Sequence, residues 1–260
     1  MVQSLSSKDN LTEILDSYGM VIMDECHHAA STSSMEVLQK VKAKYVYGVS
    51  ATPKRGDSME KILYMLLGPL RHKFTALERA AEQGIGHFFV PRYTRVVDNS
   101  ESKDDINKAY ALITSSEVRN NMIVEDVKSC VKEGKTPVIL TRMKEHAKTL
   151  ADNLKGSADH VFILYGDNSD KENLEIRTKL KQVPKNETLI LVATGQKIGE
   201  GFDFPRLDTL MLAAPVSFEG RLEQYIGRLN RDFEGKEAVY VYDYVDSHVR
   251  YFDRMYGKRL

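Results

Sequence analysis

Short apolar runs alternate with amphipathic stretches along most of the chain. Residues 18–23 (YGMVIM) are apolar and stop at Asp24-Glu25, which is typical of a buried parallel strand with a polar end. Residues 35–41 predict a helix, and residues 44–49 (KYVYGV) predict the next strand. Two strands and one helix are too few for a complete doubly wound domain, so we expect the chain to begin within a domain.

The pattern is less regular between residues 68 and 99. Gly84, Gly86 and Pro91 break regular structure in this stretch. We therefore place a domain boundary here and expect the domains to be residues 1–90 and 91–260.

The second half alternates more clearly. We predict strands over residues 137–141, 161–165, 188–193, 207–213 and 238–245, and helices over residues 105–132, 144–155, 171–182 and 219–229, followed by a last helix. Strands that alternate with helices of this length predict βαβ units and a parallel sheet. In such sheets functional groups gather at the carboxyl ends of the strands.

Composition excludes several classes of protein. The 260 residues include 37 Lys+Arg and 37 Asp+Glu, and 42% are hydrophobic, so the chain can bury a core and has no overall attraction to nucleic acid. No apolar run approaches the roughly 20 residues of a membrane helix, and the first 20 residues lack a secretion signal. Cys26 and Cys130 are too few for a disulfide framework. We expect a soluble, cytoplasmic protein without a membrane partner.

An acidic pair at the first strand end is the sharpest chemical feature. In residues 24–28 (DECHH), one carboxylate can hold Mg²⁺ through water while the other orients or deprotonates an attacking water. A polar strand end that caps the next helix is an equal alternative. Zinc binding by Cys26, His27 and His28 is a weaker one, because adjacent residues rarely converge on one ion and no second cluster completes four ligands.

Hydroxyl groups follow the second strand, in residues 50–53 (SATP). A hydroxyl at a strand end can hydrogen-bond a neighbouring carboxylate, although a turn in which Pro53 starts a helix is the simpler interpretation. The acidic strand end about 25 residues upstream in a βαβ unit strengthens the functional interpretation.

Two arginines lie close together in residues 224–231 (QYIGRLNR). Arg228 and Arg231 are spaced i, i+3 and share a helix face with Gln224. Two guanidinium groups on one face suit a phosphoryl group, and an ordinary solvated face is the alternative.

A glycine-rich segment, residues 194–203 (TGQKIGEGFD), follows an apolar strand. Glycines let a backbone approach a ligand closely, so its N–H groups, Thr194 and Lys197 can meet nucleic-acid phosphates. A purely structural turn remains the alternative.

These features, in this order, resemble helicase superfamily two, in particular the DExH branch shared by type III restriction motor subunits and DNA-repair helicases. Residues 24–27, 50–53, 137–150, 193–205 and 224–231 match motifs II, III, IV, V and VI, and the resemblance spans residues 2–245. It implies an α/β fold of RecA-like parallel sheets, with one complete C-terminal lobe and the second part of an N-terminal lobe.

The resemblance also implies a role for each matching residue at the nucleotide. Asp24 would hold Mg²⁺ through water, and Glu25 would be the base for the hydrolytic water. Arg228 and Arg231 would be arginine fingers, with Gln224 beside the γ-phosphate. Near the cleft it places Gly201 and Asp203.

The remaining matches concern nucleic acid. Ser50, Thr52 and His27 would couple the nucleotide to the nucleic-acid site. The residues expected along the nucleic-acid backbone are Arg142, Tyr165, Gly166, Thr194, Gly195 and Lys197.

The phosphate-binding loop of such motors is not matched. The nearest candidate for Gly-x-x-x-x-Gly-Lys-Ser/Thr is Gly134-Lys135-Thr136, where Ser129 stands at the first glycine, and we interpret Gly134 as a helix C-terminal glycine. We therefore expect this chain to lack motif I and the upstream part of the first lobe, and to bind ATP weakly or not at all.

The sequence leaves three functional hypotheses. The leading one is part of an ATP-dependent helicase or translocase motor that uses ATP and Mg²⁺ and acts on nucleic acid, with DNA favoured over RNA. The second is a nucleic-acid-binding or scaffold module without ATPase activity. The third is the motor subunit of a restriction system, with any nuclease on another segment or subunit.

Overall fold

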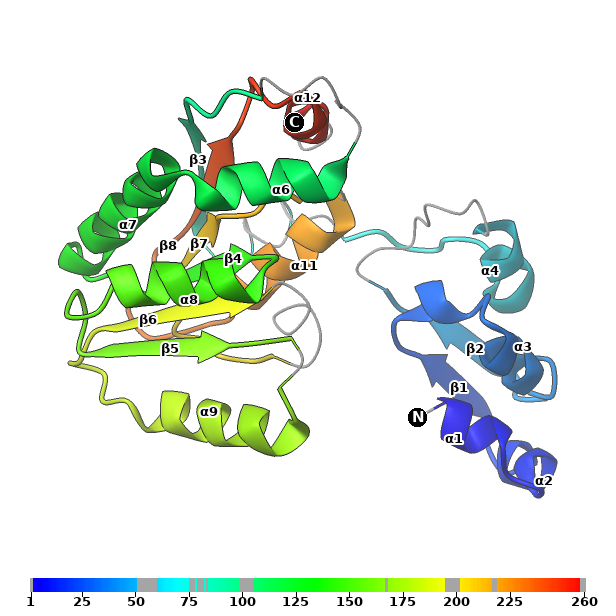
Figure 1. The fold of residues 1–260 in the computed structure, drawn as a ribbon. Coiled ribbons are helices and arrows are strands. Elements are labelled where there is room, and N and C mark those ends of the chain that lie inside the picture. The colour runs from blue at the N-terminus through cyan, green and yellow to red at the C-terminus, as the bar shows by residue number, and fades with distance from the viewer. Residues whose placement is uncertain are drawn as a thin grey trace. The chain divides into compact units, whose positions relative to one another are not determined.

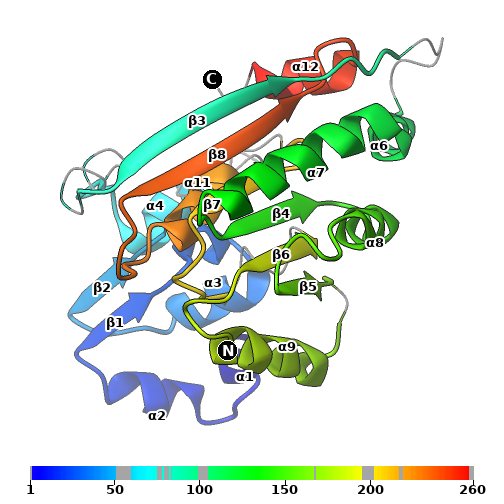
Figure 2. The same cartoon turned by 90° about the vertical axis from the view of Figure 1, so that its left-hand side faces the viewer.

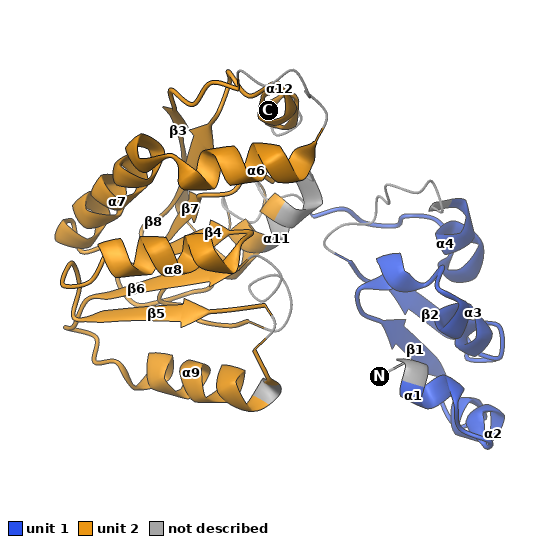
Figure 3. Cartoon of the chain, in the orientation of Figure 1, with its two compact units in different colours: residues 1–75 blue, residues 76–260 orange. Residues whose placement is uncertain are grey.

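A computed structural model describes most of the chain (Figure 1). The described residues are 2–50, 60–74, 78, 82, 84–98, 105–166, 168–194, 202–216 and 219–257, and within them the side chains of residues 2, 3, 60, 170, 219–221, 223 and 224 are not described. The chain forms two compact units, residues 1–75 and residues 76–260 (Figure 3).

Unit 1 contains a short parallel sheet. Strands β1 (Met20–Met23) and β2 (Tyr45–Gly48) pair with Met20 opposite Tyr45, and they confirm the two strands predicted here. The helices are α1 (Val2–Ser6), α2 (Leu11–Asp16), the 3₁₀ helix η1 (Cys26–His28), α3 (Thr32–Leu38) and α4 (Glu60–Leu67). The predicted helix at residues 35–41 corresponds to α3, which begins three residues earlier.

The two faces of this sheet differ. One side holds a small buried cluster. It consists of Cys26 in η1, Ala29 directly after η1, and Leu63 in α4. On the strands, Ile22 and Tyr47 lie opposite each other and are 62% and 48% exposed. Unit 1 therefore buries apolar side chains on one side of the sheet and exposes them on the other.

Unit 2 is built on a six-stranded sheet in the order β3-β8-β7-β4-β6-β5, and every neighbouring pair is parallel (Figures 1 and 2). Its strands are β3 (Gly86–Tyr93), β4 (Pro137–Thr141), β5 (His160–Leu164), β6 (Leu189–Thr194), β7 (Thr209–Leu212) and β8 (Ala238–Val245). Its helices are α6 (Ile106–Ser115), α7 (Glu117–Lys132), α8 (Lys144–Asn153), α9 (Asp170–Gln182), α11 (Glu219–Leu229) and α12 (Arg250–Tyr256).

Helices cover both faces of this sheet. One buried cluster joins α7 and α8 to alternate strand residues such as Ile139, and another joins α9 and α11 to residues such as Leu140. β4, β6 and β7 are buried along their whole length, as expected for central parallel strands. The predicted parallel α/β sheet is confirmed. Among the described helices, none has both the length and the apolar character needed to cross a bilayer.

The sequence-based interpretation was wrong for residues 86–93. Gly86 and Pro91 lie within β3, which pairs with β8 over its whole length. β3 is an edge strand, and proline is tolerated there because one side of the strand needs no backbone donor. The division between units accordingly falls at residue 75 rather than 90.

The predicted helix over residues 105–132 is two helices. Ser116 separates α6 from α7 and has extended backbone angles, with φ −73° and ψ 106°. Its hydroxyl accepts a hydrogen bond from the backbone N–H of Arg119, so Ser116 caps α7 instead of continuing α6.

Candidate functional site

The two strand ends of unit 1 meet through one hydrogen bond. Because β1 and β2 are parallel, the residues that follow them lie at the same edge of the sheet. His27 Nδ1 lies 3.0 Å from Ser50 Oγ, which joins the segment after β1 to the segment after β2. The predicted neighbourhood of the two motifs is therefore present within this unit. Thr52, the other predicted coupling residue, lies outside the described residues.

The acidic pair has a special backbone conformation. Glu25 has φ +48° and is the non-glycine residue with positive φ among those described. Its backbone N–H donates to Asp24 Oδ1 at 2.8 Å, and its own Oε2 lies 3.2 Å from His27 Nδ1. The left-handed conformation is costly for a residue with a side chain and persists only where the surrounding structure holds it. Within the described residues, no three Asp, Glu, His or Cys side chains come together as a metal site.

Close packing supports this network. A Cβ on Gly48 would lie 2.7 Å from Leu67 Cδ1 and 2.8 Å from Cys26 Cβ, so only glycine lets β2 approach η1 so closely. Burial raises the pKa of the Cys26 thiol, and the nearby Glu25 and Asp24 add to this shift. Cys26 is thus a neutral packing residue next to the acidic pair.

In unit 2, motifs V and VI contact each other. Arg231, just after α11, places Nε 3.6 Å from Asp203 Oδ1, and both side chains are partly exposed. Arg228 lies on α11 and is half-buried, whereas α11 ends at Leu229, so the prediction that both arginines lie on one helix face was wrong for Arg231. The side chain of Gln224 is not described, and Gly201 lies outside the described residues.

Two cations that follow β4 lie over aromatic rings. The Arg142 guanidinium lies 4.6 Å from the centre of the Tyr110 ring, and Lys144 Nζ lies 5.9 Å from that of Tyr165. Tyr110 also donates a hydrogen bond to the Pro215 carbonyl at 2.9 Å. No sequence pattern marks Tyr110, because its contacts join residues far apart in the chain.

A second contact lies at the ends of β5 and β6. Gly166 N–H donates to Thr194 Oγ1 at 2.6 Å, so two of the predicted nucleic-acid residues are neighbours. Gly195 and Lys197 lie outside the described residues.

A buried polar network lies beneath this edge. Thr141 Oγ1 and Asn120 Oδ1 lie 2.7 Å and 2.9 Å from the two ring nitrogens of His146. The Asn120 amide nitrogen donates to the Thr114 carbonyl, so its oxygen faces His146 and accepts from Nε2. Burial, with a smaller effect of Arg119, lowers the pKa of His146 to about 3. The imidazole is therefore neutral and fixed as one tautomer.

A fully buried ion pair completes this network. Arg119 Nε lies 2.9 Å from Asp246 Oδ1, both side chains have 0% exposure, and Arg119 also donates to the Ala213 carbonyl. Thr94 donates to the same carboxylate. The pair fixes the start of α7 against the end of β8 and the residue after β7.

The near match to a phosphate-binding loop is a helix end, as predicted. Gly134 has φ +79° and its N–H donates to the Val131 carbonyl, while Lys135 N–H donates to the Cys130 carbonyl. Lys135 Nζ lies 2.6 Å from Glu133 and 3.8 Å from the centre of the Tyr240 ring. These residues form no phosphate cradle.

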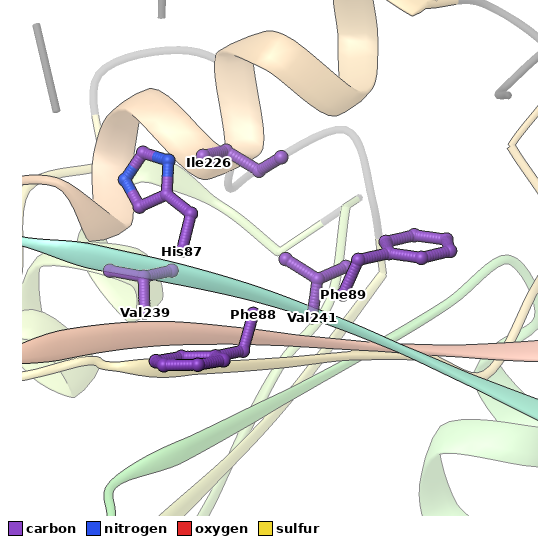
Figure 4. Close-up of a pocket in the computed structure, with 6 residues that line it drawn as sticks. All are labelled: His87, Phe88, Phe89, Ile226, Val239 and Val241. Carbon is purple, nitrogen blue, oxygen red and sulfur yellow. The ribbon is translucent and has the colours of Figure 1, made fainter. Parts of the chain in front are cut away.

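An apolar pocket lies beside α11 (Figure 4). It has a volume of about 100 Å³ and is lined by His87, Phe88, Phe89, Ile226, Val239 and Val241. Ligand pockets usually have volumes of roughly 300–1,000 Å³. The pocket is therefore too small and too apolar for a nucleotide.

Family models match both parts of the chain. Residues 1–55 match "Type III restriction enzyme, res subunit", and residues 119–232 match "Helicase conserved C-terminal domain".

Relatives named as helicases extend over nearly all of it. "Putative helicase 161L" of Invertebrate iridescent virus 6 is 28% identical over 95% of this chain and 55% of its own length. "Putative helicase 22" of a Sulfolobus islandicus filamentous virus is 26% identical over 92% and 44%. A protein of Acanthamoeba polyphaga mimivirus whose name includes "ATP-dependent RNA helicase" is 25% identical over 95% and 47%. The chain thus spans about half the length of these relatives.

Solved structures agree on the fold. Mycobacterium smegmatis helicase Lhr bound to ssDNA and AMP-PNP gives a TM-score of 0.56 at 17% identity, over 93% of this chain and 30% of that one. Saccharomyces cerevisiae Dbp5 bound to RNA and ADP BeF3 gives a TM-score of 0.54 at 12% identity, over 92% of this chain and 57% of that one. These likenesses confirm the RecA-like fold class. The chain is thus similar to helicases and restriction motor subunits in the family models that match its two parts, and to helicases in the relatives that span it.

Proposed function

We propose that the chain is part of an ATP-dependent helicase or translocase motor, in which ATP hydrolysis between two RecA-like lobes drives movement on nucleic acid. The observation that carries this proposal is the series Glu25–His27–Ser50. These contacts link the Glu25 carboxylate, which is suited to hydrolysis, to Ser50 at the end of the second strand. The state of the nucleotide site at Glu25 can thereby affect the nucleic-acid site to which Ser50 would couple it.

The described residues fit part of a Mg²⁺–ATP site. The Asp24 carboxylate is exposed, and carboxylate oxygens suit Mg²⁺, which keeps most of its water. Glu25 Oε2 lies 3.2 Å from His27 Nδ1 and makes no hydrogen bond among the described residues, so it would be the atom that accepts a proton from water. When bound, Mg²⁺–ATP supplies the phosphoryl group that is transferred to that water.

Arg228 on α11 and Arg231 just after this helix would act on the charge of that phosphoryl group. A guanidinium in this role is worth about 10³–10⁵ in rate in other enzymes. Arg231 already lies near the Asp203 carboxylate, so we expect it to exchange that partner for phosphate oxygens. Because no phosphate-binding loop is matched, we expect ATP binding by this chain to be weak.

Nucleic acid would follow the ends of β4, β5 and β6. The supporting observations are the ring-supported cations Arg142 and Lys144 and the contact between Gly166 and Thr194. Such groups meet phosphate and sugar, which carry no sequence information. We propose DNA as the preferred strand.

ATP turnover by this chain, with and without single-stranded DNA, double-stranded DNA or RNA, tests the proposal. In a protein that joins this chain to a phosphate-binding loop, Glu25→Gln should abolish stimulated turnover and retain ATP binding. Glu36→Gln, an exposed change on α3, is the matched control. Unchanged turnover in Glu25→Gln would refute the assigned base.

The second candidate is a nucleic-acid-binding module without ATPase activity. The observation in its favour is the unmatched phosphate-binding loop, since residues 134–136 form a helix end. Nucleic-acid binding that no nucleotide changes, together with no turnover in the joined protein, would support this candidate.

A further inference from the structure

Lys236 lies between α11 and β8, and its ammonium binds four backbone carbonyls. Nζ lies 2.8 Å from the carbonyl oxygens of both Leu207 and Leu229 and 3.0 Å from that of Arg231, and it also donates to the Pro205 carbonyl. All four contacts go to backbone, so they depend on the path of the chain and not on side-chain identity.

The four carbonyls come from two segments. Leu229 is the last residue of α11 and Arg231 stands two residues after it, so a lysine on these two carbonyls could be an ordinary helix cap. Pro205 and Leu207 belong to the segment that follows the glycine-rich motif. A simple cap does not explain these two contacts, because they reach a different part of the chain.

Both segments are anchored in the same buried cluster. Phe202 and Leu207 on one side and Leu229 on the other are at most 2% exposed. The ammonium joins the two segments between these anchors.

The joined segments carry the two partners of the exposed ion pair. Asp203 stands two residues before Pro205, and Arg231 is itself one of the residues whose carbonyl Lys236 binds. The 3.6 Å separation of Arg231 Nε and Asp203 Oδ1 therefore depends on two backbone segments that the Lys236 ammonium holds together.

Lys236 is unusual in charge as well. Burial lowers its pKa to about 8, and the nearby carboxylates Asp208 and Asp232 oppose this effect only in part. The ammonium would lose its proton, and one donor, in mildly alkaline solution.

We propose that Lys236 is a positioning residue that sets the place of Arg231 beside Asp203. Its ammonium binds both the carbonyl of Arg231 and the segment that carries Asp203, and so holds the two next to each other. This inference rests on the proposed function only in giving Arg231 a nucleotide to act on.

Three variants of the whole chain test it. Lys236→Met removes the ammonium at nearly constant length, Lys236→Arg retains the charge, and Lys185→Met removes a nearby exposed lysine that pairs with Glu234. The measurement is the ¹³C resonance of Arg231 Cζ, assigned with Arg231→Lys, from pH 6.5 to 9.5.

In the wild type and in Lys185→Met we expect the Arg231 resonance to shift with a midpoint near pH 8. Lys236→Met should have a displaced resonance without that midpoint. Lys236→Arg should resemble the low-pH wild type throughout. A loss of stability alone would not move the resonance of the folded protein or remove its titration.

An Arg231 resonance that is the same in Lys236→Met and wild type would overturn the inference. If Lys236→Met does not fold, the wild type decides, because a resonance that is constant between pH 6.5 and 9.5 would also overturn it.

ATP turnover in the joined protein gives an independent result. We expect kcat in Lys236→Met to fall about 10- to 100-fold with an unchanged KM for ATP, as for a misplaced group. Lys236→Arg should recover part of this loss. No turnover in any protein, with the expected Arg231 shifts, would count against the proposed function and leave the positioning by Lys236 supported.

Discussion

The guanidinium of Arg142 lies over the ring of Tyr110, 4.6 Å from its centre. The hydroxyl of the same tyrosine donates to the carbonyl of Pro215, in the segment that leads into α11. A cation at the end of β4 and the chain before the arginine-bearing helix thus share one buried side chain.

We expect Arg142 to contribute to nucleic-acid affinity through its charge. Arg142→Ala should weaken binding of single-stranded oligonucleotides of any sequence and reduce the slope of log K against log salt by about 0.7. Tyr110→Phe keeps the ring and should leave the slope unchanged. Fluorescence anisotropy over a salt series measures both, with Lys128→Ala on α7 as the control. A slope that Arg142→Ala does not change would exclude a phosphate contact.

The buried ion pair between Arg119 and Asp246 makes unit 2 sensitive to loss of either partner. Arg119→Met leaves a carboxylate without its cation at 0% exposure, which should cost about 3–5 kcal/mol in the free energy of unfolding. Urea unfolding followed by circular dichroism gives this value. Lys155→Met breaks an exposed pair with Asp152 and should cost less than about 1 kcal/mol. If Arg119→Met and Lys155→Met lowered the free energy of unfolding equally, the Arg119–Asp246 pair would not be buried.

His146 should make stability depend on pH in acid. Its pKa is about 3 in the folded protein and near 6.5 in the unfolded chain, so the unfolded state binds the extra proton between these values. Its contribution is complete above pH 6.5 and is lost as pH falls towards 3, by up to about 1.4 kcal/mol per pH unit. Unfolding of wild type and His146→Gln at pH 7, 6, 5 and 4.5 should give a shallower dependence in the variant. Parallel curves would show that His146 titrates normally.

Gly48 should tolerate no side chain. Gly48→Ala places a methyl group within 2.9 Å of three atoms of Leu67 and Cys26, which should destabilise unit 1 by about 1–3 kcal/mol. Gly19→Ala, where no atom lies within 4 Å, is the matched control. Hydrogen exchange of the β1 and β2 amides compares the two variants, and similar protection in both would show that the neighbours of Gly48 can move aside.

Strongly periodic elements were predictable from the sequence because local pattern decides them. The strands from β4 to β8 lie within about two residues of their predicted bounds. β3 was missed because its Gly86 and Pro91 are acceptable only at a sheet edge, and edge position depends on the whole topology. The break at Ser116 was missed because a capping serine looks like any polar helix residue until the next helix is placed.

The candidate site likewise contains residues whose neighbourhood was predictable from the sequence and residues whose contacts were not. The neighbourhood of His27 and Ser50 followed from parallel strand ends. The roles of Tyr110 and Lys236 depend on carbonyls distant in sequence, which no residue pattern marks. Local spacing thus identifies the residues that carry chemistry, whereas their supports emerge only from tertiary structure.

The place of β3 in the sheet also determines the order in which unit 2 can form during synthesis. β3 pairs only with β8 among the described strands, and Gly86 meets Ala238 across most of the length of the unit. A nascent chain therefore carries β3, with its apolar Phe88 and Phe89, unpaired on the ribosome until the last strand emerges. Such non-local pairing is slow and exposes aggregation-prone surface. Yield of folded protein should thus depend on chaperones that protect residues 86–93 until residues 238–245 have been synthesised.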